Sequence, residues 1–171
     1  MRRSLFAILF LAGAVTTASA TTIGSPPSLR ELTRVAEVII IGEVVLTQSE
    51  WNASRTIILT RIDVRIEEVL KGSVQGERLS FSQIGGQVGE IAASVGGTPS
   101  FTEGERVLLF LSRRGDKSLG ISGIFHGKFT IEPSEASDDK VVVRREPDSR
   151  RILDRYTLNH ARAEILQALG N

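Results

Sequence analysis

The sequence predicts a mainly β (α+β) domain with a short helix near each end. Three observations lead to this fold class. Apolar and polar residues alternate over 58–67, as in a strand with one buried face. Two other runs, 37–47 and 106–112, are apolar on both strand faces. Helix-start residues stand at Ser28 and Thr157, each followed by apolar residues at helical spacing.

Residues 1–20 are typical of a secretory signal peptide. Two arginines precede an apolar stretch from Leu5 to Val15, and small residues follow as Ala18-Ser19-Ala20. The stretch is about half as long as the roughly 20 apolar residues that a membrane anchor needs. We therefore expect cleavage before Thr21, export to the periplasm or the extracellular space, and no membrane insertion afterwards.

The remaining residues, 21–171, have the length of one domain. The chain has no cysteine, so disulfides, thiolate metal sites and a cysteine nucleophile are excluded. It has 21 basic and 20 acidic side chains, and removal of Arg2 and Arg3 leaves it nearly neutral. A basic surface for nucleic acid is therefore not expected.

A helix and a long strand open the domain. Ser28 and Glu31 have the spacing of a capping box, which predicts a helix to about Ala36. The strand at 37–47 follows directly. Gly42 lies in its middle and indicates a bulge or a bend.

A predicted loop at 48–54 carries Trp51, and its Asn52-Ala53-Ser54 triplet matches the N-glycosylation pattern, which we take only as a sign of exposure. The alternating strand at 58–67 and a strand at 78–84 come next. The alternating strand has two faces, one with Ile58, Thr60, Ile62, Val64 and Ile66 and one with Arg61, Asp63, Arg65 and Glu67. We interpret the charged face as solvated.

The segment 85–104 is long and rich in glycine, and such loops are often functional or mobile. Its candidate binding residues, together with the aromatic residue of the preceding loop, are Trp51, Gly85, Gly86, Gly96, Gly97 and Phe101. Two interpretations stay open. Either the glycines form turns and Phe101 is a plug over one end of the fold, or the segment recognises a partner.

The C-terminal part is expected to contain a fifth strand over 119–131, a short edge strand at 140–145, a loose linker at 144–156 and a helix over about 157–169 that Gly170 ends. In the fifth strand we expect Leu119, Ile121, Phe125, Phe129 and Ile131 inside and Ser122, His126, Lys128 and Thr130 outside. The helix has an apolar stripe of Leu158, Ala161, Ile165, Leu166 and Leu169.

No catalytic or metal-binding pattern is present in the sequence. His126 and His160 are the two histidines, and neither lies in a nucleophile-elbow or zinc motif. Adjacent carboxylates such as Glu67-Glu68 point to opposite faces of a strand, so they do not form an acid and base pair. Residues 137–139 are acidic but offer too few fixed oxygens for calcium. We expect no cofactor and no catalytic residues.

The ordered strand segments resemble a known fold. The series AEVIIIGEVV, TRIDVRIEEVLKG, LSFSQIGG, GERVLLFL and GIFHGKFTI covers about residues 29–132. It resembles a set of exported bacterial proteins of unknown activity and, more distantly, the netrin-like domain of the tissue inhibitors of metalloproteinases. The resemblance implies an OB-like, five- to six-stranded antiparallel barrel. Those inhibitors meet the protease zinc with an amino-terminal cysteine, which this chain lacks, so inhibition does not carry over.

The sequence therefore favours a non-enzymatic exported module that binds a protein or a glycan outside the cytoplasm. A protease-inhibitor-like module that uses another loop is the alternative, and a secreted hydrolase is the third. Burial of Trp51 and Phe101 distinguishes these interpretations, because an exposed aromatic residue beside an ordered glycine loop favours binding.

Overall fold

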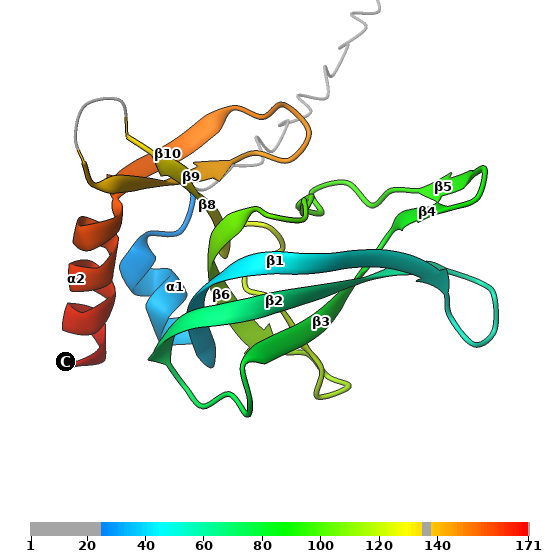
Figure 1. Cartoon of the computed structure of the whole chain (residues 1–171), viewed down its shortest axis with the longest axis horizontal. Coiled ribbons are helices and arrows are strands. Elements are labelled where there is room, and N and C mark those ends of the chain that lie inside the picture. Colours follow the sequence, from blue (N-terminus) through cyan, green and yellow to red (C-terminus); the bar gives the residue numbers. More distant parts are fainter. Residues whose placement is uncertain (1–24, 135–137, 171) are drawn as a thin grey trace, which may run out of the picture.

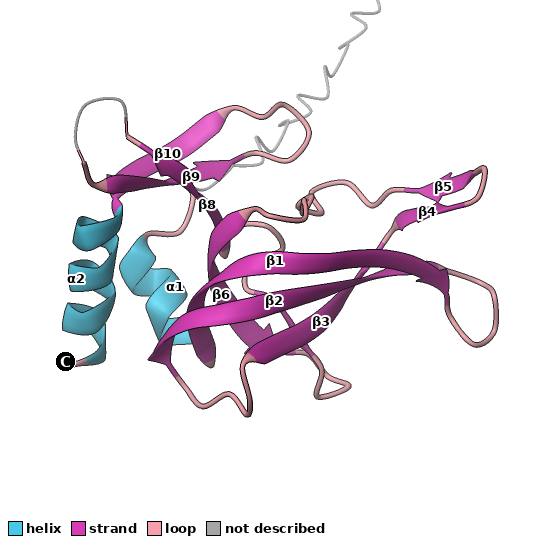
Figure 2. Cartoon of the chain, viewed as in Figure 1, coloured by secondary structure: helices cyan, strands magenta, loops and turns pink. Residues whose placement is uncertain are grey.

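The computed structural model describes residues 25–134 and 138–170 (Figure 1). The expected signal peptide and the first residue of the acidic segment at 137–139 lie outside these ranges. The elements are α1 (Leu29–Val35), β1 (Val38–Trp51), β2 (Ile58–Lys71), β3 (Arg78–Ile84), β4 (Gly86–Val88), β5 (Ile91–Ala93), β6 (Arg106–Arg113), β7 (Leu119–Ile121), β8 (Lys128–Pro133), β9 (Lys140–Arg145), β10 (Ile152–Thr157) and α2 (Leu158–Leu169). The predicted fold class, mainly β with two helices, is confirmed (Figure 2).

One antiparallel sheet contains most of the strands. Its order is β10-β9-β8-β6-β1-β2-β3, and β7 pairs with the far end of β6. The short strands β4 and β5 form a separate hairpin. Among the described residues no ladder joins the edge strands β3 and β10, so hydrogen bonds do not close the sheet into a ring.

The central strand β1 is bulged, as Gly42 predicts. Its pairing with β2 shifts register at three places, one of them between Ile41 and Gly42. A Cβ at position 42 would lie 2.4 Å from the carbonyl oxygen of Arg65. Glycine therefore allows the backbones of β1 and β2 to approach closely where the strand bends.

Two hydrophobic clusters lie on opposite faces of the sheet. The first packs the helices α1 and α2 against the sheet and contains Leu29, Leu32, Ala36, Ile39, Ile41, Leu108, Phe110, Phe129, Ile131, Val142, Leu158, Ala161 and Ile165. The second lies among strands only and contains Val38, Ile40, Val44, Ile62, Val64, Leu79, Phe81, Val107, Leu109 and Leu111. Because β1 and β6 supply both clusters, they are apolar on both faces, as predicted.

The helix caps are confirmed. Ser28 and Glu31 form the reciprocal capping box of α1, and the Thr157 hydroxyl accepts from the backbone N–H of His160 at the start of α2. The predicted stripe of α2 is too wide. Leu166 is 55% exposed and Leu169 39% exposed, since only the face with Leu158, Ala161 and Ile165 meets the sheet and α1.

Several predicted boundaries are wrong because strands continue through residues read as loop. Trp51 ends β1 instead of lying in a loop, and the turn is at 52–57. The segment 144–156, expected to be a linker, contains most of β10. As a result β9 is an inner strand and not the edge.

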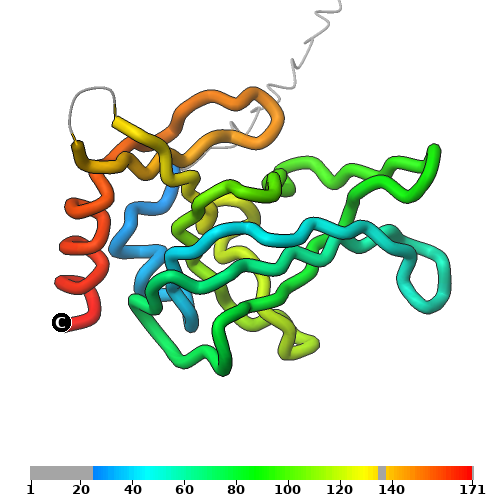
Figure 3. The backbone as a smooth tube through the Cα atoms, viewed as in Figure 1, coloured from blue at the N-terminus to red at the C-terminus, as the bar shows by residue number. Residues whose placement is uncertain are grey.

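The fifth predicted strand is two strands, β7 and β8, separated by a turn at 122–127. Backbone hydrogen bonds from Ser122 to Phe110 and from Gly127 to Ser122 close this turn against β6. Ser122 is therefore buried, although the alternation placed it outside. The hairpins β1–β2 and β4–β5 extend to the same side of the molecule, away from the helices (Figure 3).

Candidate functional site

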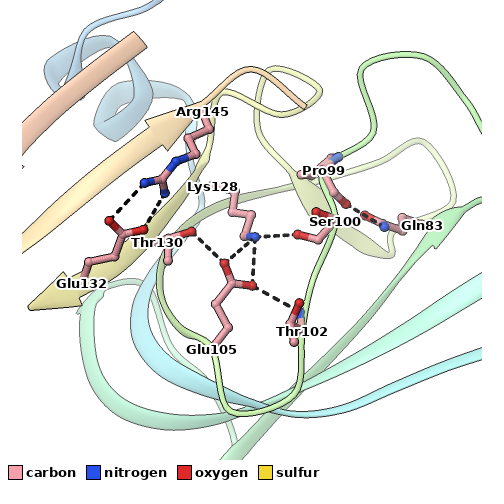
Figure 4. A network of polar contacts seen from close by, with 9 residues as sticks. All are labelled: Gln83, Pro99, Ser100, Thr102, Glu105, Lys128, Thr130, Glu132 and Arg145. Carbon is pink, nitrogen blue, oxygen red and sulfur yellow. Dashed lines mark hydrogen bonds and ion pairs between the residues drawn. The ribbon is translucent and has the colours of Figure 1, made fainter. Parts of the chain in front are cut away.

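A buried ion pair fixes the loop at 94–105 to the sheet (Figure 4). The Lys128 Nζ donates to both carboxylate oxygens of Glu105, at 2.8 and 2.9 Å, and to the carbonyl oxygen of Ser100 at 2.5 Å. Thr130 Oγ1 donates to Glu105 Oε1 at 2.7 Å. The side chains of Lys128 and Glu105 are 11% and 14% exposed. All three ammonium protons have a partner, so Lys128 holds the loop rather than awaiting a ligand.

Phe101 lies over the edge of the strand-only cluster. Its ring meets that of Phe81 edge-on, with centroids 5.6 Å apart, and Lys128 Nζ lies 4.6 Å from its centroid. The side chain is half-buried, which is the position expected of a plug. Trp51 is half-buried as well, so neither aromatic residue is a freely exposed anchor.

Two further contacts continue this network (Figure 4). Gln83 Nε2 donates to the carbonyl oxygen of Pro99 at 2.9 Å, and Arg145 forms two hydrogen bonds with the Glu132 carboxylate. Burial lowers the pKa of Lys128, and the Glu105 charge opposes that shift. The prediction that Lys128 faces solvent is wrong, because the loop covers the outer face of β8.

A polar cleft of about 400 Å³ lies beside the network, lined by three carboxylates and three basic side chains. These charged residues are Glu105, Lys128, Glu132, Arg145, Glu146 and Arg150. Most are already paired with one another or with a neighbouring residue. The cleft therefore offers balanced charge and no obvious acid and base pair.

An apolar groove of about 410 Å³ lies on the other side of the same loop. We call it the Ile84 groove, and it is lined by Gln83, Ile84, Val95, Thr98, Pro99, Arg114, Ile121 and Ile124. Ile84 is 47%, Val95 48% and Ile124 70% exposed. Three large aliphatic side chains thus converge on one surface where they remain in contact with water, which is typical of a binding surface.

Ile124 adopts an unfavourable backbone conformation. Its φ is 68°, and it is the one β-branched residue among the four non-glycine residues of the described part with positive φ. The turn that carries it packs beside Gly97, where an added Cβ would lie 3.5 Å from the Ile124 side chain. The fold therefore holds an exposed isoleucine in a strained turn, a feature that clusters at functional sites.

A third hollow, of about 360 Å³, brings several of the predicted residues together. Gly85, Gly86 and Phe101 line it with hydroxyl-bearing residues of β1 and β2. A Cβ on Gly86 would lie 2.3 Å from the Oγ of Ser49 and from the Oγ1 of Thr60, so glycine is required by packing. Gly85 and Gly86 therefore have structural reasons, since both also adopt positive φ.

The other predicted residues lie apart from this hollow. Gly97 lies against the Ile124 turn, Gly96 is exposed, and Trp51 lines neither hollow. The reasoning from sequence missed Ile84, Val95, Arg114 and Ile124. For Ile84, Val95 and Ile124 the available signal is an apolar residue outside the apolar faces of the predicted strands, and no such signal marks Arg114.

The histidines do not form a catalytic arrangement. Burial and the Arg144 charge lower the pKa of His126, and its Nδ1 is buried without a partner in the described part of the chain. His160 lies on the exposed face of α2, and its Nε2 is 3.5 Å from the Oε2 of Glu164. Over residues 25–134 and 138–170, no hydrogen bond links either ring to a serine hydroxyl, and no three His, Asp or Glu side chains converge as metal ligands.

Comparisons with known proteins give no relative. No protein-family model, no curated protein and no solved structure matches this chain. In the described part of the chain, neither helix has the length and apolarity needed to cross a membrane. The Ile84 groove and the polar network beside it are therefore the features of the molecule that bear on function.

Proposed function

We propose that this chain is an exported, non-enzymatic binding module that captures a polypeptide partner in the Ile84 groove. The observation that carries the proposal is the convergence of Ile84, Val95 and Ile124 around an exposed apolar groove. Export rests on the signal-peptide pattern of residues 1–20. An exported or cell-surface protein is thus the expected partner, and a glycan is the other class to test.

The rigidity of the loop supports recognition. Pro99, in the wall of the groove, accepts from Gln83, and the next carbonyl, that of Ser100, accepts from Lys128. A wall that is ordered before binding loses little conformational entropy when a partner docks. In the neighbouring polar cleft Lys128 pairs with Glu105 and Arg145 with Glu132, which favours binding over acid and base catalysis.

We also propose that the strand-only cluster is the interior of an OB-like barrel, as the sequence resemblance implies. The approach of β3 to β7 supports this arrangement, since Arg114 Nη1 donates to the carbonyl oxygen of Ser82 across the gap. In OB-folds loops at the barrel rim bind ligands. The Ile84 groove lies at this junction of β3 and β7.

A random twelve-residue peptide display library tests the proposal with the purified chain. Selected peptides should bind the unmodified chain and lose about three- to tenfold in affinity to Ile84→Ser. Full burial of an aliphatic side chain is worth about 1.5–3 kcal/mol, and a partner can cover only the 47% of Ile84 that is exposed, which is worth about 0.7–1.4 kcal/mol. Ile152→Ser is the matched control, since Ile152 on β10 is 49% exposed and lies away from the groove. Equal loss in both variants, or none in either, contradicts the proposal.

Two other assays distinguish the alternatives. A glycan array on which Ile84→Ser loses binding would replace the polypeptide partner with a carbohydrate. Inhibition of a panel of secreted proteases by the unmodified chain would favour the inhibitor-like module.

Mass spectrometry of the chain recovered from the exported fraction should show a first residue of Thr21, and an intact Met1 would contradict export with cleavage.

A further inference from the structure

Arg114 is a fixed cation at the edge of an otherwise apolar and neutral groove. Its guanidinium lies directly against Gly120, where a Cβ would be 2.3 Å from Nε. One nitrogen, Nη1, donates to the carbonyl oxygen of Ser82 at 3.0 Å. The side chain is held at two points and leaves other N–H donors available.

No carboxylate forms an ion pair with this guanidinium within the described residues. Arg114 takes part in none of the ion pairs found there. Asp116 is two residues away, and its pKa is lowered by hydrogen bonds from Ser118 and, to a smaller extent, by the Arg114 charge. Its Oδ1 accepts from the backbone N–H and the hydroxyl of Ser118, and it forms no ion pair with the guanidinium. The neighbouring Arg113, by contrast, pairs with Glu37. The groove thus combines aliphatic contacts with one unpaired, oriented positive charge.

The hairpin beside the groove offers a backbone edge. β5 pairs with β4 on one side, and no described strand lies on its other side. Its residues Ile91 to Ala93 are exposed and uncharged, and the chain continues from them to Val95 in the groove. An open strand edge of this kind is a template for pairing with another extended chain.

We infer that the occupant of the Ile84 groove is an extended polypeptide segment that places an acidic side chain on Arg114 and apolar side chains beside Ile84, Val95 and Ile124. The inference rests on the proposed function and adds the chemistry of the partner. The carboxylate matches the unpaired guanidinium, with which it forms charge-assisted hydrogen bonds. The backbone of the segment matches the free edge of β5, which distinguishes a peptide from an anionic lipid.

Three labelled ten-residue peptides test the inference by fluorescence anisotropy. Each alternates valine and threonine and has an acetylated first residue. The first has a central glutamate and an amidated end, the second has glutamine in place of glutamate, and the third has glutamine and a free carboxyl end. We expect the glutamate peptide to bind about tenfold more tightly than the glutamine peptide, and this ratio to fall toward one in Arg114→Gln. Arg113→Gln is the matched control and should keep the ratio.

Each other outcome overturns the inference in a recognisable way. Equal binding of the first two peptides, or a ratio that persists in Arg114→Gln, removes the role of Arg114. Preference for the third peptide assigns the site to a chain terminus. Binding of decanoate measured by calorimetry, together with no binding of any peptide, assigns it to an anionic lipid. Library peptides that depend on Ile84 but not on Arg114 refute the acidic partner and leave the proposed function intact. Thermal unfolding of Arg114→Gln confirms that the variant is folded.

Discussion

Replacement of Ile124 by asparagine should make the protein more stable and a weaker binder. An L-residue in the left-handed region is unfavourable by about 1–2 kcal/mol, and asparagine tolerates that region better than isoleucine does. Ile124 is 70% exposed, so it buries less than a third of its surface. If full burial of isoleucine is worth about 1.5–3 kcal/mol, removing this partial burial costs about 0.5–0.9 kcal/mol. The free energy of unfolding should rise by about 0.5–1 kcal/mol.

Chemical denaturation measures this change, and for a domain of this size it corresponds to roughly 2 °C in Tm. Ile124→Val is the control, because valine keeps the β-branch and should give no gain. Binding of the selected library peptides should weaken at least severalfold in Ile124→Asn, since this variant removes the most exposed aliphatic side chain of the groove. A fall in stability would refute the reasoning, as it would mean that the packing of Ile124 outweighs the backbone strain.

Three further predictions concern the scaffold. Gly42→Ala should lower the free energy of unfolding by at least about 2 kcal/mol in urea denaturation, since its Cβ meets the Arg65 carbonyl oxygen; an unchanged midpoint would contradict the close approach. Arg144 is 1% exposed and pairs with Asp154, so Arg144→Met should lower the free energy of unfolding by about 3–5 kcal/mol. The double variant Arg144→Met with Asp154→Leu should recover most of that loss. No recovery would argue against a buried pair. Hydrogen bonds from Arg61 hold the pKa of Asp63 at about 2, below its ordinary 3.8, so the contribution of Asp63 to stability is present above pH 4 and is lost as pH falls through 2. Asp63→Asn should flatten the pH dependence of the free energy of unfolding over this range. An unaltered slope would exclude this carboxyl as the source of the pH dependence.

The features that the sequence predicts correctly are local ones. The capping box at Ser28 is formed by residues three positions apart, and the alternation over 58–67 records the two faces of β2. The prediction that the charged face is solvated is wrong for Asp63, which is 5% exposed and pairs with Arg61. Gly42 indicates the bulge of β1 because a glycine inside an apolar strand weakens it unless the backbone bends or another strand approaches closely there. In each case the cause of the structure lies within a few residues of its signal.

The features that sequence reasoning missed depend on partners distant in the sequence. The segment 140–145 was expected to be an edge strand and 144–156 a linker, but β10 lies in that linker and its Asp154 pairs with the buried Arg144. Strand alternation placed Lys128 outside. This prediction failed because a loop more than twenty residues earlier in the sequence covers Lys128. The groove has the same origin, since Ile84, Val95 and Ile124 meet only after folding and no spacing rule connects them.

The ion pair of Lys128 and Glu105 explains why this groove is ordered and still exposed. Burial of two charges is offset by their attraction only when the geometry is good, so such a pair adds little net stability over apolar residues of similar volume. What it does supply is position, because Lys128 binds the Ser100 carbonyl, next to the groove wall at Pro99. Because this hydrogen bond fixes the loop at Ser100, the groove wall at Pro99 is positioned without the groove side chains packing into a core. Under the proposed function, Ile84, Val95 and Ile124 are exposed to a partner beside a wall that is ordered before binding.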